Sequence, residues 1–311
     1  MSLIKKPMLA AKMEFSDGTP ATFSDLLFPK MGSIKLDGIR CITRNGVSLS
    51  RSFESIPNLF VQKTMADLPS DLDGELVTIN KDGSLRTFNQ IQSDIMSEDG
   101  EPNFKYMIFD YVKDSLNKDF SLRFLDLKNL VLPHYCEIVD HVVLNSVEEL
   151  EKYEEKIVNE GHEGVMLRTI KGPYKCGRAT FKSQDLLKIK RFVDSEAVII
   201  GFKEKFKNDN EAEVDQLGHT KRSNAKAGLI PANTLGTLLV KDMYSNVEFG
   251  IGTGIGFNDE LKKTIWQNQD KYLGKIIKYR YQGVGSKLDK TNNGVVPRIP
   301  SFQGFRSKLD M

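Results

Sequence analysis

The sequence has no apolar run that approaches the ~18 residues of a membrane-spanning helix, and no apolar segment follows the lysines near its start. It has only three cysteines, Cys41, Cys136 and Cys176, and no Cys-x-x-Cys pair, which excludes a disulfide framework and a zinc cage of cysteines. Its four histidines show no spacing typical of metal ligands. We therefore expect an intracellular protein that is not secreted and has no membrane partner.

A large net charge is also missing, because 44 Lys and Arg residues stand against 42 Asp and Glu residues, with a formal net charge of +2. The charge is nevertheless uneven: residues 168–191 contain eight basic residues and one acidic residue, and residues 271–308 contain nine and one. Two basic tracts within structured sequence favour a polyanionic partner such as nucleic acid. Each tract taken alone is equally well explained as a solvated face.

The length of 311 residues predicts two domains at roughly 150 residues each. A capping box at residues 146–149 and apolar residues at helical spacing predict a helix that ends at Gly161, and a second helix runs from Asn258 towards Gly274. The other elements predicted in the first two thirds are strands, at residues 32–43, 46–51, 73–79, 106–112, 164–168 and 186–192. This pattern predicts an α+β domain of antiparallel sheets and helices over residues 1–192.

The remaining residues, 193–311, are predicted to form a small barrel such as an OB-fold. Its strands are expected at residues 196–202, 235–241, 246–251 and 275–281, with one helix before the last of them. The polar segment 203–233 between the first two strands is too long for an ordinary connection. Its closely spaced cations Lys221, Arg222 and Lys226 favour a segment that becomes ordered on a phosphate backbone, with a disordered loop as the alternative.

The chemistry is concentrated in the run Lys35-Leu36-Asp37-Gly38-Ile39-Arg40. A lysine becomes a nucleophile only when its amine loses its proton, which neighbouring cations or a desolvating pocket promote. Gly38 permits a tight backbone path, and Arg40 offers a bidentate grip on phosphate. The alternative is a strand that runs into a turn, with Lys35 and Arg40 solvated.

This run resembles motif I of the covalent nucleotidyltransferases, the superfamily of ATP-dependent DNA ligases, RNA ligases and mRNA capping enzymes. Five further motifs of that superfamily follow in the same order: Ser50-Arg51-Ser52-Phe53, Asp73-Gly74-Glu75-Leu76, Phe109-Asp110-Tyr111-Val112, Glu163-Gly164-Val165-Met166-Leu167-Arg168 and Leu187-Lys188-Ile189-Lys190. The resemblance is strongest to the minimal ATP-dependent DNA ligases of large DNA viruses such as Chlorella virus, and weaker to those of T7-like phages. It implies a nucleotidyltransferase (ATP-grasp-like DNA ligase) domain and an OB-fold with an inserted latch, a hairpin or loop at about residues 203–233.

The resemblance also implies the chemical roles of single residues. Lys35 would attack the α-phosphate of ATP and hold AMP as a phosphoramidate. Glu75 would bind the ribose and Phe109 would stack on the adenine, although by composition Phe109 alone would more often be a core aromatic. Glu163, together with Glu75, would hold the Mg²⁺, or Mn²⁺ in its place.

Two lysines are expected to act as a catalytic pair. Lys188 and Lys190 are two positions apart on a predicted strand, so both point to the same face while Leu187 and Ile189 face the core. The resemblance places both ammonium groups on the α-phosphate. There they would neutralise the charge that develops in the transition state.

The resemblance implies DNA contacts in both domains. Arg40 and Arg51 would hold phosphates of the nucleotide or of the 5′ end of the nick. Further contacts to DNA would come from five residues: Arg168, Arg178, Lys221, Arg222 and Lys226. Arg298 and Arg306 would take part in the closure of the second domain over ATP. We expect a monomer that encircles nicked duplex DNA, in the cytoplasm of a bacterial or virus-infected host or in a eukaryotic nucleus.

The sequence thus predicts an ATP-dependent DNA ligase that seals 3′-OH/5′-phosphate nicks through lysyl-AMP and DNA-adenylate intermediates, in replication, repair or recombination. Two alternatives stay open. A capping guanylyltransferase would share residues 35–40 and the OB-fold, but not a latch-like insertion. A non-enzymatic nucleic-acid-binding module would explain the basic tracts alone.

Overall fold

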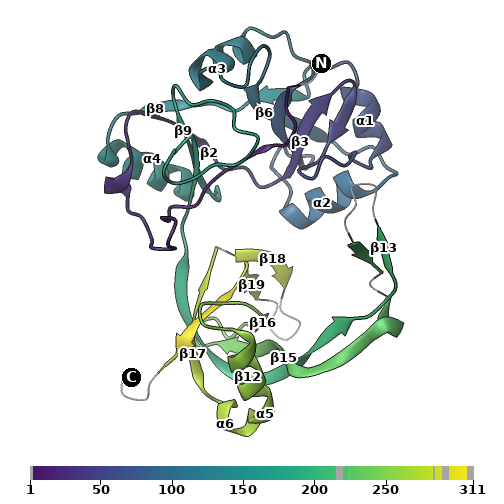
Figure 1. Ribbon diagram of the computed structural model, residues 1–311, viewed down its shortest axis with the longest axis vertical. Coiled ribbons are helices and arrows are strands. Elements are labelled where there is room, and N and C mark those ends of the chain that lie inside the picture. The colour runs from purple at the N-terminus through teal and green to yellow at the C-terminus, as the bar shows by residue number, and fades with distance from the viewer. Residues whose placement is uncertain (1–2, 215–219, 224, 283, 289–293, 307–311) are drawn as a thin grey trace. The chain divides into compact units, whose positions relative to one another are not determined.

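The computed structural model describes residues 3–214, 220–223, 225–282, 284–288 and 294–306 (Figure 1). The chain divides into two compact units, unit 1 (Met1–Arg191) and unit 2 (Phe192–Met311). Among the helices of these described ranges, none has the length and apolar character that crossing a membrane requires.

A five-stranded sheet forms one half of unit 1, with the strand order β4-β3-β5-β6-β7 and antiparallel neighbours except for β6 and β7. Its strands are β3 (Ile39–Arg44), β4 (Val47–Leu49), β5 (Leu72–Thr78), β6 (Phe104–Tyr111) and β7 (Cys136–Ile138). The helices α1 (Leu59–Met65), α2 (Phe88–Met96) and α3 (Phe120–Lys128) pack on β4, β5 and β6 respectively. Buried apolar side chains of the sheet and of all three helices form one core.

The other half of unit 1 is an antiparallel sheet with the order β11-β9-β2-β8. Its strands are β2 (Lys30–Ile34), β8 (Val142–Leu144), β9 (Gly164–Thr169) and β11 (Leu186–Lys190). The helix α4 (Val147–Asn159) packs on β9, and its N-cap Ser146 accepts a hydrogen bond from the Glu149 amide, as the capping box predicts. A single-turn helix spans Phe23–Asp25, and the short strand β1 (Met8–Leu9) pairs in parallel with β10 (Gly177–Arg178).

Two features of unit 1 differ from the sequence prediction. Residues 32–43, predicted as one strand, belong to β2 and β3, which lie in different sheets and are separated by residues 35–38. The pattern also misses α1, α2 and α3, because each has nine residues or fewer and so offers little helical periodicity. A capping box of Thr87 and Gln90 marks the start of α2, and this pattern in the sequence could have predicted that helix.

Unit 2 contains a five-stranded antiparallel sheet with the order β16-β15-β12-β17-β20. Its strands are β12 (Val193–Asn208), β15 (Leu229–Asp242), β16 (Glu248–Ile251), β17 (Ile276–Tyr281) and β20 (Ser301–Phe305). The predicted helix after Asn258 is split at Asn268 into α5 (Asp259–Gln267) and α6 (Gln269–Tyr272). A separate hairpin pairs β18 (Val284–Leu288) with β19 (Val295–Pro297).

The barrel expected for unit 2 is not closed by a ladder of hydrogen bonds. Over the described ranges, the edge strands β16 and β20 are not paired with each other, and the two edges meet at an isolated bridge between Gly254 and Phe302. A Cβ atom at Gly254 would lie 2.2 Å from the Phe302 carbonyl oxygen, so the close approach requires glycine. The sheet is therefore an OB-like half-closed barrel.

The segment 203–233 is largely paired and is not a simple loop. Strands β12 and β15 stay paired as far as Asn208 and Leu229, with register shifts along the ribbon. Beyond their ends, β13 (Ala212–Val214) and β14 (Thr220–Arg222) form a hairpin, followed by a single-turn helix at Lys226–Gly228. The segment predicted as a latch therefore contains a paired hairpin, and its role as a latch stays a prediction.

Candidate active site

A cavity of about 530 Å³ lies in unit 1. Most of the predicted site residues of this unit line it: Lys35, Arg40, Arg51, Glu75, Phe109, Arg168, Lys188 and Lys190. Glu163 adjoins the cavity, where its carboxylate accepts hydrogen bonds from Lys35 and Lys190. Side chains from all six sequence motifs therefore meet in one place.

Lys35 occupies the break between the two sheets of unit 1. Its amide donates to the Gly164 carbonyl oxygen at 2.8 Å and so extends the pairing of β2 with β9 by one residue. The chain then turns through Gly38, whose Cβ atom, if present, would lie 2.4 Å from the Leu76 carbonyl oxygen. Only glycine permits this approach, so the sequence Asp37-Gly38 carries the chain from one sheet into the other.

The Lys35 ammonium is ion-paired with Glu163 and also donates to the Leu36 carbonyl oxygen at 3.1 Å. The second oxygen of Glu163 accepts from Lys190. Burial raises the pKa of Glu163, but Lys35 and Lys190 outweigh it and hold the pKa below the usual value. One carboxylate thus stays ionised between two ammonium groups.

Strand β11 presents both catalytic candidates to the cavity. Lys188 and Lys190 line it, whereas Leu187 and Ile189 are buried in the core, which is the alternation expected of a strand. Burial lowers the pKa of Lys188, and the nearby cations Lys190, Arg178 and Lys35 lower it further. The site is therefore a concentration of positive charge suited to phosphate.

Gly164 sets the distance between β9 and β11. Its φ is +152°, and a Cβ atom would lie 2.1 Å from the Ile189 carbonyl oxygen. Because Glu163 precedes Gly164 and Lys190 follows Ile189, this close contact brings the carboxylate to the ammonium group. The Glu-Gly pair of the sequence motif is thus explained by packing.

Arg40 lies against the wall of the cavity and is engaged there. Its Nε and one terminal nitrogen each donate to the Asp73 carboxylate at 2.6 Å, and the same nitrogen donates to the Met8 carbonyl oxygen at 3.1 Å. The guanidinium lies 4.6 Å from the centre of the Phe109 ring. Part of the phosphate-binding capacity expected of Arg40 is therefore already used by Asp73.

Glu75, Phe109 and Arg51 are the other nucleotide-binding candidates that line the cavity. Half-buried Glu75 accepts from the Gly38 amide at 3.1 Å, and burial raises its pKa more than Arg40 and Lys35 lower it. Half-buried Phe109 stands on β6, while Arg51 is exposed in the turn after β4. One cavity therefore offers a nucleotide an apolar ring, a carboxylate and an exposed cation.

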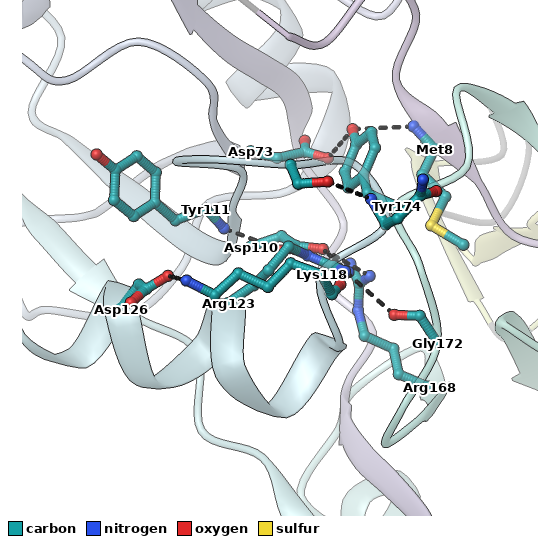
Figure 2. A network of polar contacts seen from close by, with 12 residues as sticks. Met8, Asp73, Asp110, Tyr111, Lys118, Arg123, Asp126, Arg168, Gly172 and Tyr174 are labelled. Atoms are coloured by element: carbon teal, nitrogen blue, oxygen red, sulfur yellow. Dashed lines mark hydrogen bonds and ion pairs between the residues drawn. The ribbon is translucent and has the colours of Figure 1, made fainter.

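The surroundings of Arg168 do not support its prediction as a DNA contact. Its side chain is only 4% exposed and donates to Asp110 at 2.9 Å, and Asp110 also takes two bonds from Arg123 (Figure 2). The guanidinium lies over the rings of Phe120 and Phe109, at 4.6 and 5.6 Å. An arginine held in this way is a fixed part of the cavity wall.

The remaining predicted cations are not among the residues that line this cavity. Arg178 is exposed and donates to the Ala10 carbonyl oxygen at 3.0 Å. In unit 2, exposed Arg222 donates to the Asn210 carbonyl oxygen and exposed Lys226 lies in the single-turn helix, while the side chain of Lys221 and residues 215–219 lie outside the described part.

The two arginines of the C-terminal tract each make a contact within unit 2. Arg306 donates to Glu196 and lines a separate cavity of about 550 Å³ within unit 2. Arg298 follows β19, and its carbonyl oxygen accepts from the Gln282 amide at 3.0 Å. Neither arginine lines the cavity of unit 1.

Sequence reasoning misses the residues that hold the site in place. Asp73 and Asp110 lie inside the motifs around Glu75 and Phe109, but their partners Arg40, Arg123 and Arg168 are distant in sequence. Side chains from one face of α2 also line the cavity: Phe88, Gln92 and Met96. Their spacing of four residues is the only signal that could have grouped them.

The fold and the cavity define a nucleotidyltransferase domain joined to an OB-like domain. A family model described as ATP dependent DNA ligase domain matches residues 7–190, and one described as DNA ligase OB-like domain matches residues 231–306. The chain belongs to the family of ATP-dependent DNA ligases. This confirms the predicted family and the OB-fold, and it favours a ligase over the capping enzyme.

Three relatives illustrate the similarity. The crystal structure of a Chlorella virus DNA ligase-adenylate is 31% identical, covers 97% of this chain and 100% of that chain, and has a TM-score of 0.54. A DNA ligase of Saccharolobus islandicus is 29% identical over 136 residues, which are 40% of this chain and 22% of that protein. The DNA ligase of Enterobacteria phage T4 is 24% identical over 198 residues, which are 60% of this chain and 36% of that protein.

Proposed function

We propose that this protein seals nicks in duplex DNA that carry a 3′-hydroxyl and a 5′-phosphate, with ATP as the source of AMP. The observation that carries this proposal is the set of ion pairs from Lys35 and Lys190 to Glu163, in a cavity that Lys188 and the ring of Phe109 also line. A primary amine among cations is suited to attack a phosphate and to remain attached to it.

The reaction divides into three displacements at phosphorus. First, the Lys35 ammonium loses one proton, the resulting amine bonds to the α-phosphorus of ATP, pyrophosphate leaves, and the nitrogen releases a second proton to solvent. Glu163 accepts a hydrogen bond from Lys35 and so orients its nitrogen in the cavity. Next, the 5′-phosphate of the nick displaces Lys35 from AMP, and finally the 3′-hydroxyl displaces AMP to form the phosphodiester.

The other residues bind and stabilise in this proposal. The ammonium groups of Lys188 and Lys190 neutralise the negative charge that builds on the α-phosphate in the transition state. Phe109 stacks on the adenine, and Glu75 accepts hydrogen bonds from the ribose hydroxyls. Arg51, exposed at the cavity rim, is the cation best placed to meet a second phosphate.

A divalent cation, Mg²⁺ or Mn²⁺, fits the donor chemistry of the site. Over the described ranges, no group of three or more His, Cys, Asp or Glu side chains is able to hold a metal on its own. Mg²⁺ commonly takes one or two carboxylates and completes its shell with substrate phosphates and water. Glu163, with Glu75, would supply such a partial set, and the ion when bound would neutralise phosphate charge.

The test is a sealing assay on a nicked duplex with one labelled strand. With ATP and Mg²⁺ we expect a strand of joined length, and with a chelator or with GTP in place of ATP we expect none. If the protein forms a covalent adduct with the nucleotide of GTP and none with that of ATP, the proposal is overturned in favour of a capping reaction. A chain that binds the nick but never gains AMP would point to a non-enzymatic module.

We propose further that the hairpin ribbon of unit 2 contacts the DNA backbone, so that a monomer closes around the duplex. Arg222 and Lys226 are exposed there, and Asn210 fixes the base of the hairpin by donating to the Ser223 and Ala225 carbonyl oxygens at 2.8 and 2.9 Å. A braced hairpin that carries exposed cations suits a phosphate backbone.

Neutralising Lys221, Arg222 and Lys226 together is expected to weaken nick binding and to leave AMP uptake by Lys35 largely intact, because the cavity belongs to unit 1. The slope of log affinity against log salt should fall by about 0.9 for each DNA phosphate that these cations no longer neutralise. The matched control removes three exposed cations of unit 1, Lys63, Lys152 and Lys156. Equal slopes for both triple variants would mean that the hairpin cations are merely solvated.

A further inference from the structure

The N-terminal segment forms part of the cavity. Leu9 and Ala10 line it, next to Met8 in β1. The segment is fastened at several points, including bonds from the Leu3 and Ile4 amides to Asp71 at 2.6 and 3.1 Å. Its position relative to the wall that carries Arg40 therefore matters for the shape of the site.

The buried hydroxyl of Tyr174 connects the N-terminal segment to the wall that carries Arg40. Tyr174 is 2% exposed, and its Oη accepts from the Met8 amide at 3.0 Å and donates to the Asp73 carboxylate at 2.6 Å (Figure 2). Burial, with the negative charge of Asp73 beside it, holds the pKa of Tyr174 well above its usual value, so the hydroxyl remains a donor. The link from Met8 to Asp73 thus runs through a neutral phenol.

Asp73, which Tyr174 holds in place, in turn holds the guanidinium of Arg40. The carboxylate is fully buried, and each of its oxygens takes one guanidinium bond, while Oδ2 also takes the bond from Tyr174. A bidentate pair fixes the plane of a guanidinium only as well as the carboxylate is itself fixed. The guanidinium carbon in turn lies over the ring of Phe109, 4.6 Å from its centre, and Phe109 is the proposed platform for adenine.

We propose that Tyr174 is a positioning residue, which orients Arg40 through Asp73 and couples the N-terminal segment to the phosphate-binding wall of the cavity. The inference rests on the proposed sealing function and extends it to a residue outside the six motifs. Tyr174 touches neither nucleotide nor DNA in this account. Its effect on catalysis is transmitted entirely by the Asp73 to Arg40 pair.

The experiment compares the single-turnover sealing rates of the wild type, Tyr174→Phe, Arg40→Ala and the double variant. Tyr174→Phe is expected to seal about tenfold to a hundredfold more slowly, because small displacements of a positioned group have effects of that size. In the Arg40→Ala background the same change should cause no further loss, because residues that act through one another are not additive. Additive losses, or an unchanged rate in the single variant, would overturn the proposal.

A matched control separates positioning from packing. Tyr135 donates its hydroxyl to a backbone carbonyl oxygen, that of Thr64 at 2.8 Å, and lies outside the residues that line the cavity. Tyr135→Phe should lower the melting temperature less than Tyr174→Phe, because it loses one bond to a neutral acceptor, and it should seal at the wild-type rate. If Tyr174→Phe lowers only the melting temperature, its hydroxyl is structural and the proposal is wrong.

A second readout does not depend on sealing. Amide hydrogen exchange of residues 8–10, measured without ATP or DNA, should become faster in Tyr174→Phe, because the Met8 amide loses its acceptor. Unchanged exchange would contradict the coupling. A wild type that seals no nicks would instead overturn the proposed function, and the exchange result would still decide whether Tyr174 holds the segment.

Discussion

Lys35→Ala is expected to take up no AMP from ATP and to seal no nicks, while it folds and still binds nicked DNA. The side chain is the proposed covalent nucleophile, and no other group can accept AMP at that position. Lys35 shares Glu163 with Lys190, which continues to pair with this carboxylate in the variant. Mass spectrometry of the intact chain after incubation with ATP and Mg²⁺ measures the result directly.

Lys35→Arg tests whether a positive charge at this position is enough for AMP uptake. A guanidinium keeps the ion pair with Glu163 but remains protonated at any working pH, so this variant should be nearly as inactive as Lys35→Ala. Lys63→Ala, which removes an exposed lysine from the last turn of α1, is the control and should gain AMP like the wild type. AMP found on Lys35→Ala would show that another residue is the nucleophile.

The sequence predicts the family and many of the strands because motifs and strand alternation are local. Lys188 and Lys190 face the cavity for the same reason that Leu187 and Ile189 face the core. The break at residues 35–38 is different. It depends on the close approach of Gly38 to Leu76 on another strand, which no local pattern encodes.

The ion pairs that support the site cannot be predicted from the sequence either. Asp73 and Arg40 are 33 positions apart, and Tyr174 joins them from 101 positions beyond Asp73. Composition predicts such residues to be solvated, because Asp and Arg are rarely buried unless they are paired. Only the fold reveals the pairing, and with it the difference between an arginine free to bind phosphate and one already engaged.

The ribbon of unit 2 shows a third limit of sequence reasoning. A polar segment rich in cations predicts a loop, yet β12 and β15 remain paired along much of it, with irregular register. The irregularity conceals the strand period of two, because each bulge shifts the alternation by one residue. Charge and length identified the segment as a candidate contact to DNA, while its form as a hairpin required the structure.

The buried cluster behind Phe109 has two arginines and one carboxylate. Asp110 is fully buried and accepts from Arg123 at 2.8 and 3.1 Å, from Arg168 at 2.9 Å, and from the Tyr111 amide at 3.0 Å (Figure 2). Burial raises the pKa of Asp110, but the two arginines outweigh it and keep the pKa below its usual value. The carboxylate is therefore ionised and is the shared partner of two buried guanidinium groups.

Asp110→Ala is expected to lower the free energy of unfolding of unit 1 by roughly 3–5 kcal/mol, because it leaves buried charges without their partner. Urea unfolding followed by circular dichroism measures the loss, and Trp266, the single tryptophan of the chain, reports on unit 2 separately. The control is Asp126→Asn, since Asp126 pairs with Lys118 near the surface, where solvent screens the pair and it contributes little to stability. AMP uptake per folded molecule should fall as well in Asp110→Ala, because Arg168 loses the bond that holds it against Phe109. A loss of stability no larger than that of Asp126→Asn would show that the arginines do not depend on this carboxylate.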